Sequence, residues 1–283
     1  MTPLRQKMID LMVLKGYSPK TQKSYLYSVE KVARHFGRSP DSIDVGELES
    51  YFLYLLTEKR MASASVRLIV NGMRFLNNQV LQRPARDFLV RYPKRAQRIP
   101  ELLTRDEVHR ILSHTRNLKH HTLLATCYAA GLRVSELVHL RVRDIDSARE
   151  LVHIRAGKGN KDREVILPES LLLLLRRYWQ FYRPMVALFY GQDPRKPLDA
   201  GTVGKIFTRA KAAAGIDKQG GVHSLRHAYA THQLEAGMPT FKLQRLLGHT
   251  DMKSTLRYVH WLPSYQNRGK LGMDLLCWSE ASS

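Results

Sequence analysis

The sequence has few of the residues that mark secreted or membrane-bound proteins. Only two of its 283 residues are cysteines, Cys127 and Cys277, and both lie in apolar stretches, so we expect buried free thiols and a reducing compartment. The longest aliphatic run, residues 171–175, is far too short to span a bilayer. Charge interrupts the first apolar stretches, unlike in a secretory signal. These absences predict a soluble cytoplasmic protein with no membrane partner.

Metal-binding patterns are also scarce. His223 and His227 are four residues apart, which suits two ligands on one helix face, but no HExxH glutamate, nearby carboxylate or thiol completes a site. We therefore expect neither a metal nor another cofactor. We expect His227, His232 and His260 to serve packing or hydrogen bonding.

Acidic residues are heavily outnumbered. The chain carries 25 Asp and Glu against 46 Lys and Arg, a formal net charge of +21. Such a balance suits a polyanion, namely DNA, RNA or an acidic membrane surface. Division of the chain near residue 95 leaves net charges of +9 and +12 on its two parts. Both parts are therefore expected to touch the partner.

Residues 1–90 are predicted to form a compact all-α domain. Apolar residues recur at helical spacing in four stretches, and Ser18-Pro19 and Gly37 bound the second stretch as a helix start and a helix end. A basic linker with two prolines follows over residues 91–100. The basic side chains here belong either to a solvated surface or to a surface that follows a phosphate backbone. Arg60, Arg67 and Arg74 are seven residues apart, which predicts that they lie on one face of the last helix region. The candidates for DNA binding are Arg60, Arg67, Arg74, Arg91, Lys94 and Arg95.

Residues 101–265 read as a second domain. We expect a capped helix start at 104–107, helices to about residue 140 with a break at Gly131, and a β-hairpin over 151–167 that turns at 157–160. Further helices are expected over 168–182 and 202–214 and toward the end. The fold class is therefore mainly α with a small antiparallel β-sheet. The apolar tail, residues 266–283, packs either on its own domain or on a neighbouring protomer.

Short motifs in this second domain contain candidate phosphate ligands. Arg133 begins a helix, where free N–H groups favour anions, and Glu136 shares its face. Lys158 occupies a glycine-flanked turn from which it could reach a phosphate oxygen. His223 and Arg226 are three residues apart on one helix face. Each motif taken alone also fits an ordinary surface or turn.

Two further candidates follow in the chain. His249 projects from a turn after a helix that ends at Gly248. Tyr258 lies on the next helix, about 110° from the centre of its apolar stripe, so we expect it on the rim of the core. A phenol with a pKa near 10 is only about 0.1% ionised at pH 7. Two arginines and a histidine nearby would help such a phenol act as a nucleophile.

The joint occurrence of these motifs, in this order, is specific. The segments GLRVSELVHL, GKGNKDREV, HSLRHAYATHQLEAG, LQRLLGH and STLRYVH resemble the tyrosine recombinase (phage integrase) family, particularly its Xer-like and integron-integrase-like members. The resemblance covers essentially the whole chain. Residues 1–90 resemble the family's helical core-binding (SAM-like) domain, and residues 101–265 resemble its catalytic domain.

The resemblance implies a site-specific DNA recombinase that cleaves and rejoins DNA through a 3′-phosphotyrosyl intermediate, without metal or ATP. Tyr258 would be the nucleophile and Lys158 the general acid. The remaining implied roles are charge stabilisation and proton transfer by Arg133, His223, Arg226 and His249, with Glu136 in support. The implied partners are a double-stranded DNA recombination site and three further copies of the chain in a synaptic homotetramer. The chain would be a monomer or dimer off DNA and would associate with the nucleoid.

Alternative readings remain open at this point. The segment between residues 182 and 223 is too short for the extra helical insertion typical of integron integrases, which favours a transposon, plasmid, phage or chromosomal Xer-like enzyme. The rival functions are a DNA-binding regulator without catalysis, a type IB topoisomerase that acts as a single protomer, and an RNA-associated polyanion binder.

Overall fold

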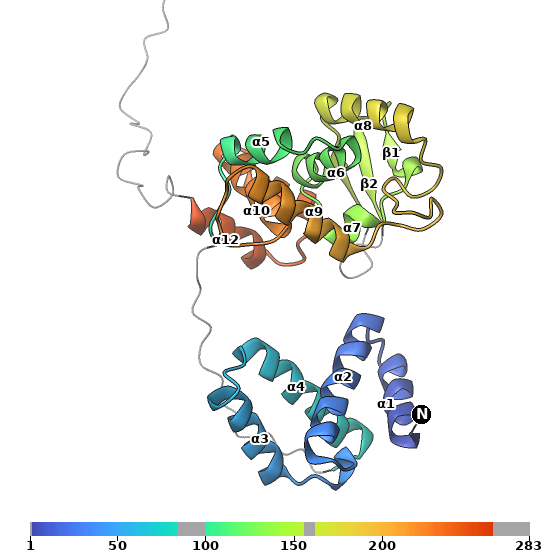
Figure 1. Ribbon diagram of the computed structural model, residues 1–283, viewed down its shortest axis with the longest axis vertical. Helices are drawn as coiled ribbons and strands as arrows, with labels where there is room; N and C mark the ends of the chain where they lie inside the picture. The colour runs from blue at the N-terminus through green and yellow to red at the C-terminus, as the bar shows by residue number, and fades with distance from the viewer. Residues whose placement is uncertain (1, 84–99, 156–161, 263–283) are drawn as a thin grey trace, which may run out of the picture. The chain divides into compact units, whose positions relative to one another are not determined.

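The computed structural model describes residues 2–83, 100–155 and 162–262, in two compact units, Met1–Gln97 and Arg98–Ser283. Figure 1 shows an all-helical first unit and a second unit in which helices surround a small sheet. The mainly α fold with a small antiparallel sheet is thus confirmed. Within the described ranges, no helix is both long and apolar enough to cross a membrane.

The described part of the first unit contains four α-helices, as the periodicity predicts. The Ser18 hydroxyl accepts a hydrogen bond from the Thr21 amide at the start of α2, and Gly37 ends that helix with a φ of +65°. Asp44 and Glu47 form a capping box at the start of α3. The helices are α1 (Pro3–Leu14), α2 (Pro19–Phe36), α3 (Val45–Thr57) and α4 (Ser63–Phe75), with a 3-10 turn at Pro40–Ser42 and a π-helical turn at Leu76–Val80.

A close approach of α2 and α4 builds the core of this unit. A Cβ atom added at Gly72 of α4 would lie 3.0 Å from the Cβ of Ser28 and 3.3 Å from the carbonyl oxygen of Tyr25. Glycine therefore lets the two helix backbones pack together. The buried apolar side chains around this contact include Met12, Val32, Leu48, Phe52, Val66 and Met73.

The second unit holds eight α-helices among its described residues. A capping box at Thr104 and Glu107 starts α5, as predicted. The helices are α5 (Arg105–Ser113), α6 (Leu118–Ala129), α7 (Val134–Val138), α8 (Glu169–Tyr182), α9 (Ala200–Ala213), α10 (His223–Glu235), α11 (Thr240–Leu247) and α12 (Lys253–Trp261), with a 3-10 turn at Val142–Asp144.

The sheet has three antiparallel strands in the order β1-β2-β3. The predicted hairpin is present as β2 (Leu151–Ile154) and β3 (Arg163–Ile166), in which Val152 pairs with Val165. The predicted turn at 157–160 lies outside the described residues. The first strand, β1 (Ile145–Asp146), was not predicted, because two residues are too few to show alternation.

Two apolar clusters support the second unit. The larger one packs the helices from α5 through α10 against the sheet. Its buried side chains include Leu123, Leu132, Val152, Phe207 and Leu225. The smaller one lies among α10, α11 and α12 and contains Tyr229, Leu243, Leu247, Tyr258 and Leu262. This smaller cluster carries the candidate site.

Candidate active site

The structure brings together five of the six residues that the sequence analysis singled out. Arg133 lies at the N-cap of α7, and His223 and Arg226 lie in the first turns of α10. His249 follows the αL glycine that ends α11, and Tyr258 lies on α12. The sixth, Lys158, falls outside the described residues.

An open pocket of about 390 Å³ lies at the meeting point of these elements. Four of the candidates line it, and the fifth, Arg226, lies behind it with a relative exposure of 1%. No group of three or more His, Cys, Asp or Glu side chains within the described ranges is arranged to hold a metal ion. The lining residues include Arg133, His223, His227, His249, Arg257, Tyr258 and Trp261.

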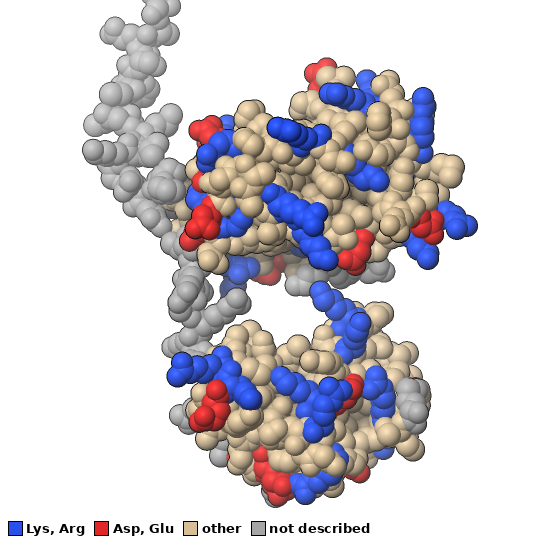
Figure 2. Space-filling view, viewed as in Figure 1, with Lys and Arg blue, Asp and Glu red and all other residues tan. Residues whose placement is uncertain are grey.

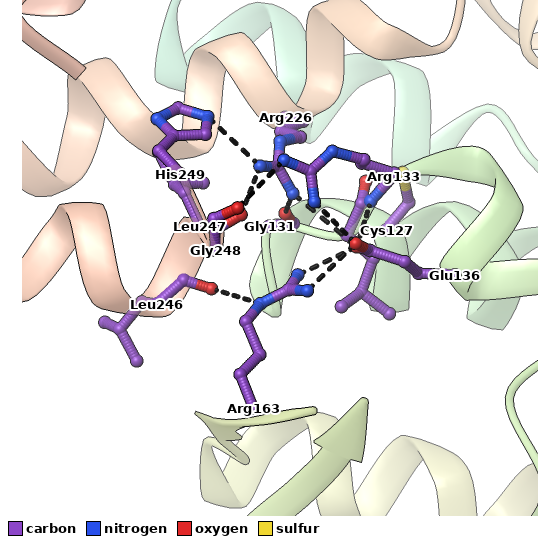
Figure 3. Close-up of polar contacts among 11 residues, drawn as sticks. Cys127, Gly131, Arg133, Glu136, Arg163, Arg226, Leu246, Leu247, Gly248 and His249 are labelled. Atoms are coloured by element: carbon purple, nitrogen blue, oxygen red, sulfur yellow. Dashed lines mark hydrogen bonds and ion pairs between the residues drawn. The ribbon is translucent and has the colours of Figure 1, made fainter. Parts of the chain in front are cut away.

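Glu136 joins the arginines of the site (Figure 3). Its carboxylate accepts hydrogen bonds from the Arg133 backbone amide at 2.8 Å and from Arg133 Nη1 at 2.7 Å. Both Nη atoms of Arg163 donate to it at 2.8–2.9 Å, and Arg226 Nη1 lies 3.6 Å away. Burial by itself raises the pKa of Glu136, but the hydrogen bonds and charge of Arg163, together with Arg133, lower this pKa to about 2. Glu136 is therefore ionised at neutral pH.

Arg226 is a guanidinium held almost wholly inside the protein. Nη1 donates to the Gly131 carbonyl at 2.8 Å, and Nη2 donates to the Leu247 carbonyl at 2.6 Å. Burial, and then the charge of Arg133, lower its pKa to about 10. The side chain therefore remains charged at pH 7 and is available to stabilise negative charge that develops in the pocket.

Hydrogen bonds determine the tautomer of His249. Arg226 Nη2 lies 3.3 Å from His249 Nε2, and since a guanidinium only donates, Nε2 accepts. The proton is then on Nδ1, which donates to the Thr255 hydroxyl at 2.9 Å. Burial, followed by the charges of Arg226 and Arg133, lowers the pKa of His249 to about 4. His249 is therefore neutral at pH 7.

Tyr258 is buried, with a relative exposure of 3%, so its expected place on the rim of the core is wrong. The apolar stripe of α12 alone suggested a rim position. The packing of α12 on α10 covers this flank as well, because His227 of α10 lies against the phenol ring with a centroid separation of 5.6 Å, and Trp261 of α12 itself adds a ring 5.2 Å away. The ring of His249 lies nearly parallel to that of Tyr258.

The pKa of the Tyr258 phenol is raised in this state of the chain. Burial is the dominant cause, and it outweighs the charges of Arg226, Arg257 and Arg133, which act in the opposite direction. The expected help from the arginines is present, but it does not ionise the phenol without DNA. The hydroxyl therefore keeps its proton and lies 3.1 Å from His227 Nδ1.

His223 and His227, two of the three histidines of α10, are held in the neutral form. Burial, then His223 and Arg226, lower the pKa of His227 to about 4. The pKa of His223 is also lowered, by partial burial and then by Arg226 and Arg133. At neutral pH both rings are therefore uncharged, and each has a ring nitrogen that can accept a hydrogen bond.

Two residues of this site were not among the predicted site residues. His227 was expected to serve packing or hydrogen bonding in general, and only the crossing of α10 and α12 shows that its partner is the Tyr258 hydroxyl. Arg163, which contacts Glu136 across 27 residues of sequence, had no predicted role. The alternation of β3 places Arg163 on the inward face of the strand. Because buried charges are generally paired, this position could have predicted an acidic partner.

The DNA-binding candidates of the first unit are only partly placed. Arg67 and Arg74 lie on α4, but Arg60 precedes that helix, in the turn after α3, with a φ of +47°. The predicted single face is therefore wrong for Arg60, because its backbone leaves the helical region. Figure 2 shows Lys and Arg side chains on the visible surface of both units, with fewer acidic ones. The linker candidates Arg91, Lys94 and Arg95 lie outside the described residues.

Comparison with known families agrees with this geometry. Residues 101–264 match the phage integrase family, and residues 4–87 match the phage integrase N-terminal SAM-like domain. The chain belongs to the phage integrase family, the tyrosine recombinases.

Individual relatives extend over most of the chain. A putative integrase/recombinase of Sinorhizobium fredii is 42% identical over 262 residues, which cover 92% of this chain and 84% of that protein. The tyrosine recombinase XerA of Thermococcus kodakarensis is 32% identical and covers 91% of this chain and 92% of its own length. A crystal structure of XerA recombinase matches with a TM-score of 0.56 at 26% identity, covering 94% of this chain and 96% of that one. A lambda integrase tetramer bound to a Holliday junction matches in fold, with a TM-score of 0.74 at 18% identity and coverages of 90% and 76%.

Proposed function

We propose that this chain is a site-specific DNA recombinase that cleaves and rejoins DNA through a 3′-phosphotyrosyl intermediate, with Tyr258 as the nucleophile. The observation that carries the proposal is the single pocket that holds the phenol together with Arg133, His223 and His249, with Arg226 behind it. Family membership supports the same chemistry, since the relatives carry the names integrase, recombinase and tyrosine recombinase.

The arginines supply the charge that phosphoryl transfer needs. Negative charge spreads over the non-bridging oxygens in the transition state, and positioning and electrostatics account for most of the catalysis. Arg133 is partly exposed at the pocket, with 19% of its side chain accessible, so it can turn toward a phosphate. Arg226 adds a fixed positive charge from its buried position behind the pocket. Removal of one such group typically lowers a rate about 10²- to 10³-fold.

The histidines handle the proton of the phenol. In the cleavage step the Tyr258 oxygen forms a bond to phosphorus while the bond from phosphorus to the 5′ oxygen breaks. The phenol loses one proton and the 5′ oxygen gains one. His227 is the acceptor in place for the first transfer, and His223 and His249 line the same pocket. We assign the second transfer to Lys158 on the family resemblance, since that residue lies outside the described chain.

The reaction needs no external energy source. A phosphodiester is exchanged for a tyrosyl phosphate ester of similar energy and is later restored by the attack of a 5′-hydroxyl. The guanidinium groups take the electrostatic role that Mg²⁺ has in other phosphoryl transfers.

The proposed partners are a double-stranded DNA recombination site and three further copies of the chain. The net charge of +21 and the basic surface of both units favour DNA. The lambda integrase with this fold was solved as a tetramer on a Holliday junction, which supports a synaptic tetramer here. We place the chain on the nucleoid. The tail, residues 266–283, lies outside the described residues, so packing on its own domain and packing on a neighbouring protomer both stay predictions.

Covalent capture on DNA tests the function. Nicked duplexes drawn from the DNA that flanks the gene trap the intermediate, because the short cleaved strand diffuses away. We expect the wild-type chain to form a protein–DNA adduct that survives denaturation. We expect Tyr258→Phe to form none, since the phenylalanine ring keeps the packing but lacks the nucleophile.

Tyr229→Phe is the matched control, because Tyr229 lies buried in the same apolar cluster. It should form the adduct at the wild-type rate. An adduct with Tyr258→Phe would show that the nucleophile is another residue. Relaxation of supercoiled DNA by a single protomer without a defined site would instead favour a topoisomerase.

A further inference from the structure

The C-terminal end of α11 is covered by three arginines from three different elements (Figure 3). The last carbonyl groups of a helix have no partner within the helix and carry its negative dipole end, so cations are stabilised there. Here three consecutive carbonyls each accept a hydrogen bond from a different guanidinium. The pairs are Arg163 Nε to Leu246 at 2.7 Å, Arg226 Nη2 to Leu247 at 2.6 Å, and Arg133 Nη2 to Gly248 at 3.3 Å.

Glu136 faces the same three guanidinium groups from the other side. Its carboxylate lies within ion-pair distance of all three, and 4% of its side chain is accessible. Arg163 binds it with two parallel hydrogen bonds, the strongest geometry for such a pair. The charged and titratable groups near this carboxylate are Arg133 of the α7 N-cap, Arg163 of β3, Arg226 and His223 of α10, and the buried thiol of Cys127 on α6.

Arg163 differs from the other two arginines in where its side chain ends. Arg226 contacts His249, and Arg133 lines the pocket that holds Tyr258. Arg163, by contrast, lines an adjoining hollow of about 700 Å³ between the sheet and the turn after α11. Arg163 donates hydrogen bonds to the Glu136 carboxylate and to the Leu246 carbonyl at the end of α11, and neither of these residues lines the pocket that holds Tyr258.

We propose that Arg163 is a positioning residue for DNA cleavage, which holds Glu136 against Arg133 and Arg226 and fixes the end of α11 from which His249 projects. This inference rests on the proposed recombinase function. It adds a residue that acts on the charge and geometry of the site without touching the phosphate.

The electrostatic part of the role follows from burial. Only 8% of the Arg163 side chain and 4% of the Glu136 side chain are accessible, so water compensates little when one of them is removed. Without Arg163, the hydrogen bonds and the charge that lower the pKa of Glu136 are reduced, so burial raises this pKa. The carboxylate then takes up a proton at a higher pH, and it no longer orients the two remaining guanidinium groups.

The geometric part follows from contact with Gly248. This glycine has a φ of +60°, and a Cβ atom added there would lie 2.9 Å from Arg163 Cδ. The Arg163 side chain therefore passes directly against the residue that turns the chain toward His249. A shift of about 1 Å in a catalytic group can lower a rate about 100-fold, so loss of this support should be visible in the chemical step.

The test compares Arg163→Met and Arg163→Lys with Arg155→Met in the full chain, by adduct formation at saturating nicked DNA. Arg155 pairs with the separate carboxylate of Asp144 and is the matched control. We expect Arg163→Met to slow cleavage about 10- to 100-fold, with DNA affinity within about 3-fold of wild type. Lysine keeps the charge but cannot form the fork, so Arg163→Lys should recover only part of the rate. Arg155→Met should cleave at the wild-type rate.

The pH profile separates positioning from a general structural defect. We expect the acid limb of the cleavage rate to move upward by about one to two pH units in Arg163→Met and to return toward wild type in Arg163→Lys. Addition of Glu136→Gln to Arg163→Met should abolish this moved limb and lower the rate by much less than Glu136→Gln does in the wild-type background.

Two results would overturn the inference. One is a cleavage rate of both Arg163 variants within about 3-fold of wild type, together with an acid limb at the wild-type pH. The other is full additivity of the Arg163 and Glu136 losses. If wild type forms no adduct, the proposed function fails, and the pH dependence of unfolding still decides the inference. As the pH falls, the stabilisation by ionised Glu136 should be lost at a higher pH in Arg163→Met than in wild type. Arg163→Lys replaces this variant if the methionine variant does not fold. A pH dependence of unfolding equal to that of wild type refutes the role.

Discussion

Replacement of Gly131 by alanine should damage the second unit more than the same change at a matched glycine. Gly131 follows the end of α6 with a φ of +59°, and Gly215 follows the end of α9 with a φ of +66°. A Cβ atom at Gly131 would lie 2.4 Å from the Tyr229 ring, whereas one at Gly215 would meet nothing within 4 Å. The two positions share the backbone strain and differ in the collision.

The magnitudes follow from these two terms. An L-residue in the left-handed region costs about 1–2 kcal/mol at either position. Relief of the overlap at Gly131 requires a buried ring to move by about 1 Å, and such overpacking costs about 1–3 kcal/mol more. Gly131→Ala should therefore be less stable than Gly215→Ala by about 2 kcal/mol, or about 4–8 °C in the midpoint of thermal unfolding.

Tryptophan fluorescence can follow this transition selectively. None of the three tryptophans of the chain, at positions 179, 261 and 278, falls in the first unit, and Trp179 and Trp261 lie on α8 and α12 of the second. The Gly131 carbonyl also accepts a hydrogen bond from Arg226, so Gly131→Ala should slow adduct formation while Gly215→Ala leaves it unchanged. Equal losses of stability in the two variants would show that the ring does not resist the added methyl group.

Two further predictions concern protonation and capping. The free energy of unfolding should fall as the pH drops from about 6.5 to 4, because the pKa values of His227 and His249 are about 4 in the folded chain and near 6.5 when unfolded, so the unfolded state binds more protons in this window. Fluorescence-detected unfolding at a series of pH values measures this slope, which should become shallower in His227→Asn. Thr104→Ala removes one half of the capping box of α5 and should cost about 1 kcal/mol, whereas Thr208→Ala on the exposed face of α9 should cost less than half of that. Equal midpoints for the two threonine variants in urea would contradict the capping argument.

Local sequence signals predicted much of the fold because their causes are local. Ser18 and Gly37 bound α2, and Thr104 with Glu107 starts α5, since each cap is completed within a few residues. The β2–β3 hairpin also came from alternation within one short segment. The same reasoning failed for Arg60, because a positive φ just before α4 removes it from the helix without a strong sequence signal.

The residues of the candidate site could also be predicted from the sequence, but their arrangement could not. The motifs indicated Arg133, His223, Arg226, His249 and Tyr258, and the family resemblance predicted that they form one site. The depth of the phenol depended on how α12 crosses α10, which the apolar stripe of one helix does not specify. Burial then decided the direction of its pKa, against the nearby arginines.

The sequence by itself therefore determined the helices, the hairpin, the basic character and the residue types of a phosphoryl-transfer site. Only the tertiary structure decided which side chains meet. It placed His227 on the Tyr258 hydroxyl and Arg163 between Glu136 and the end of α11. The physical reason is that caps and periodicity depend on neighbours in the chain, whereas the pairing of buried charges depends on which distant elements the apolar cores bring together.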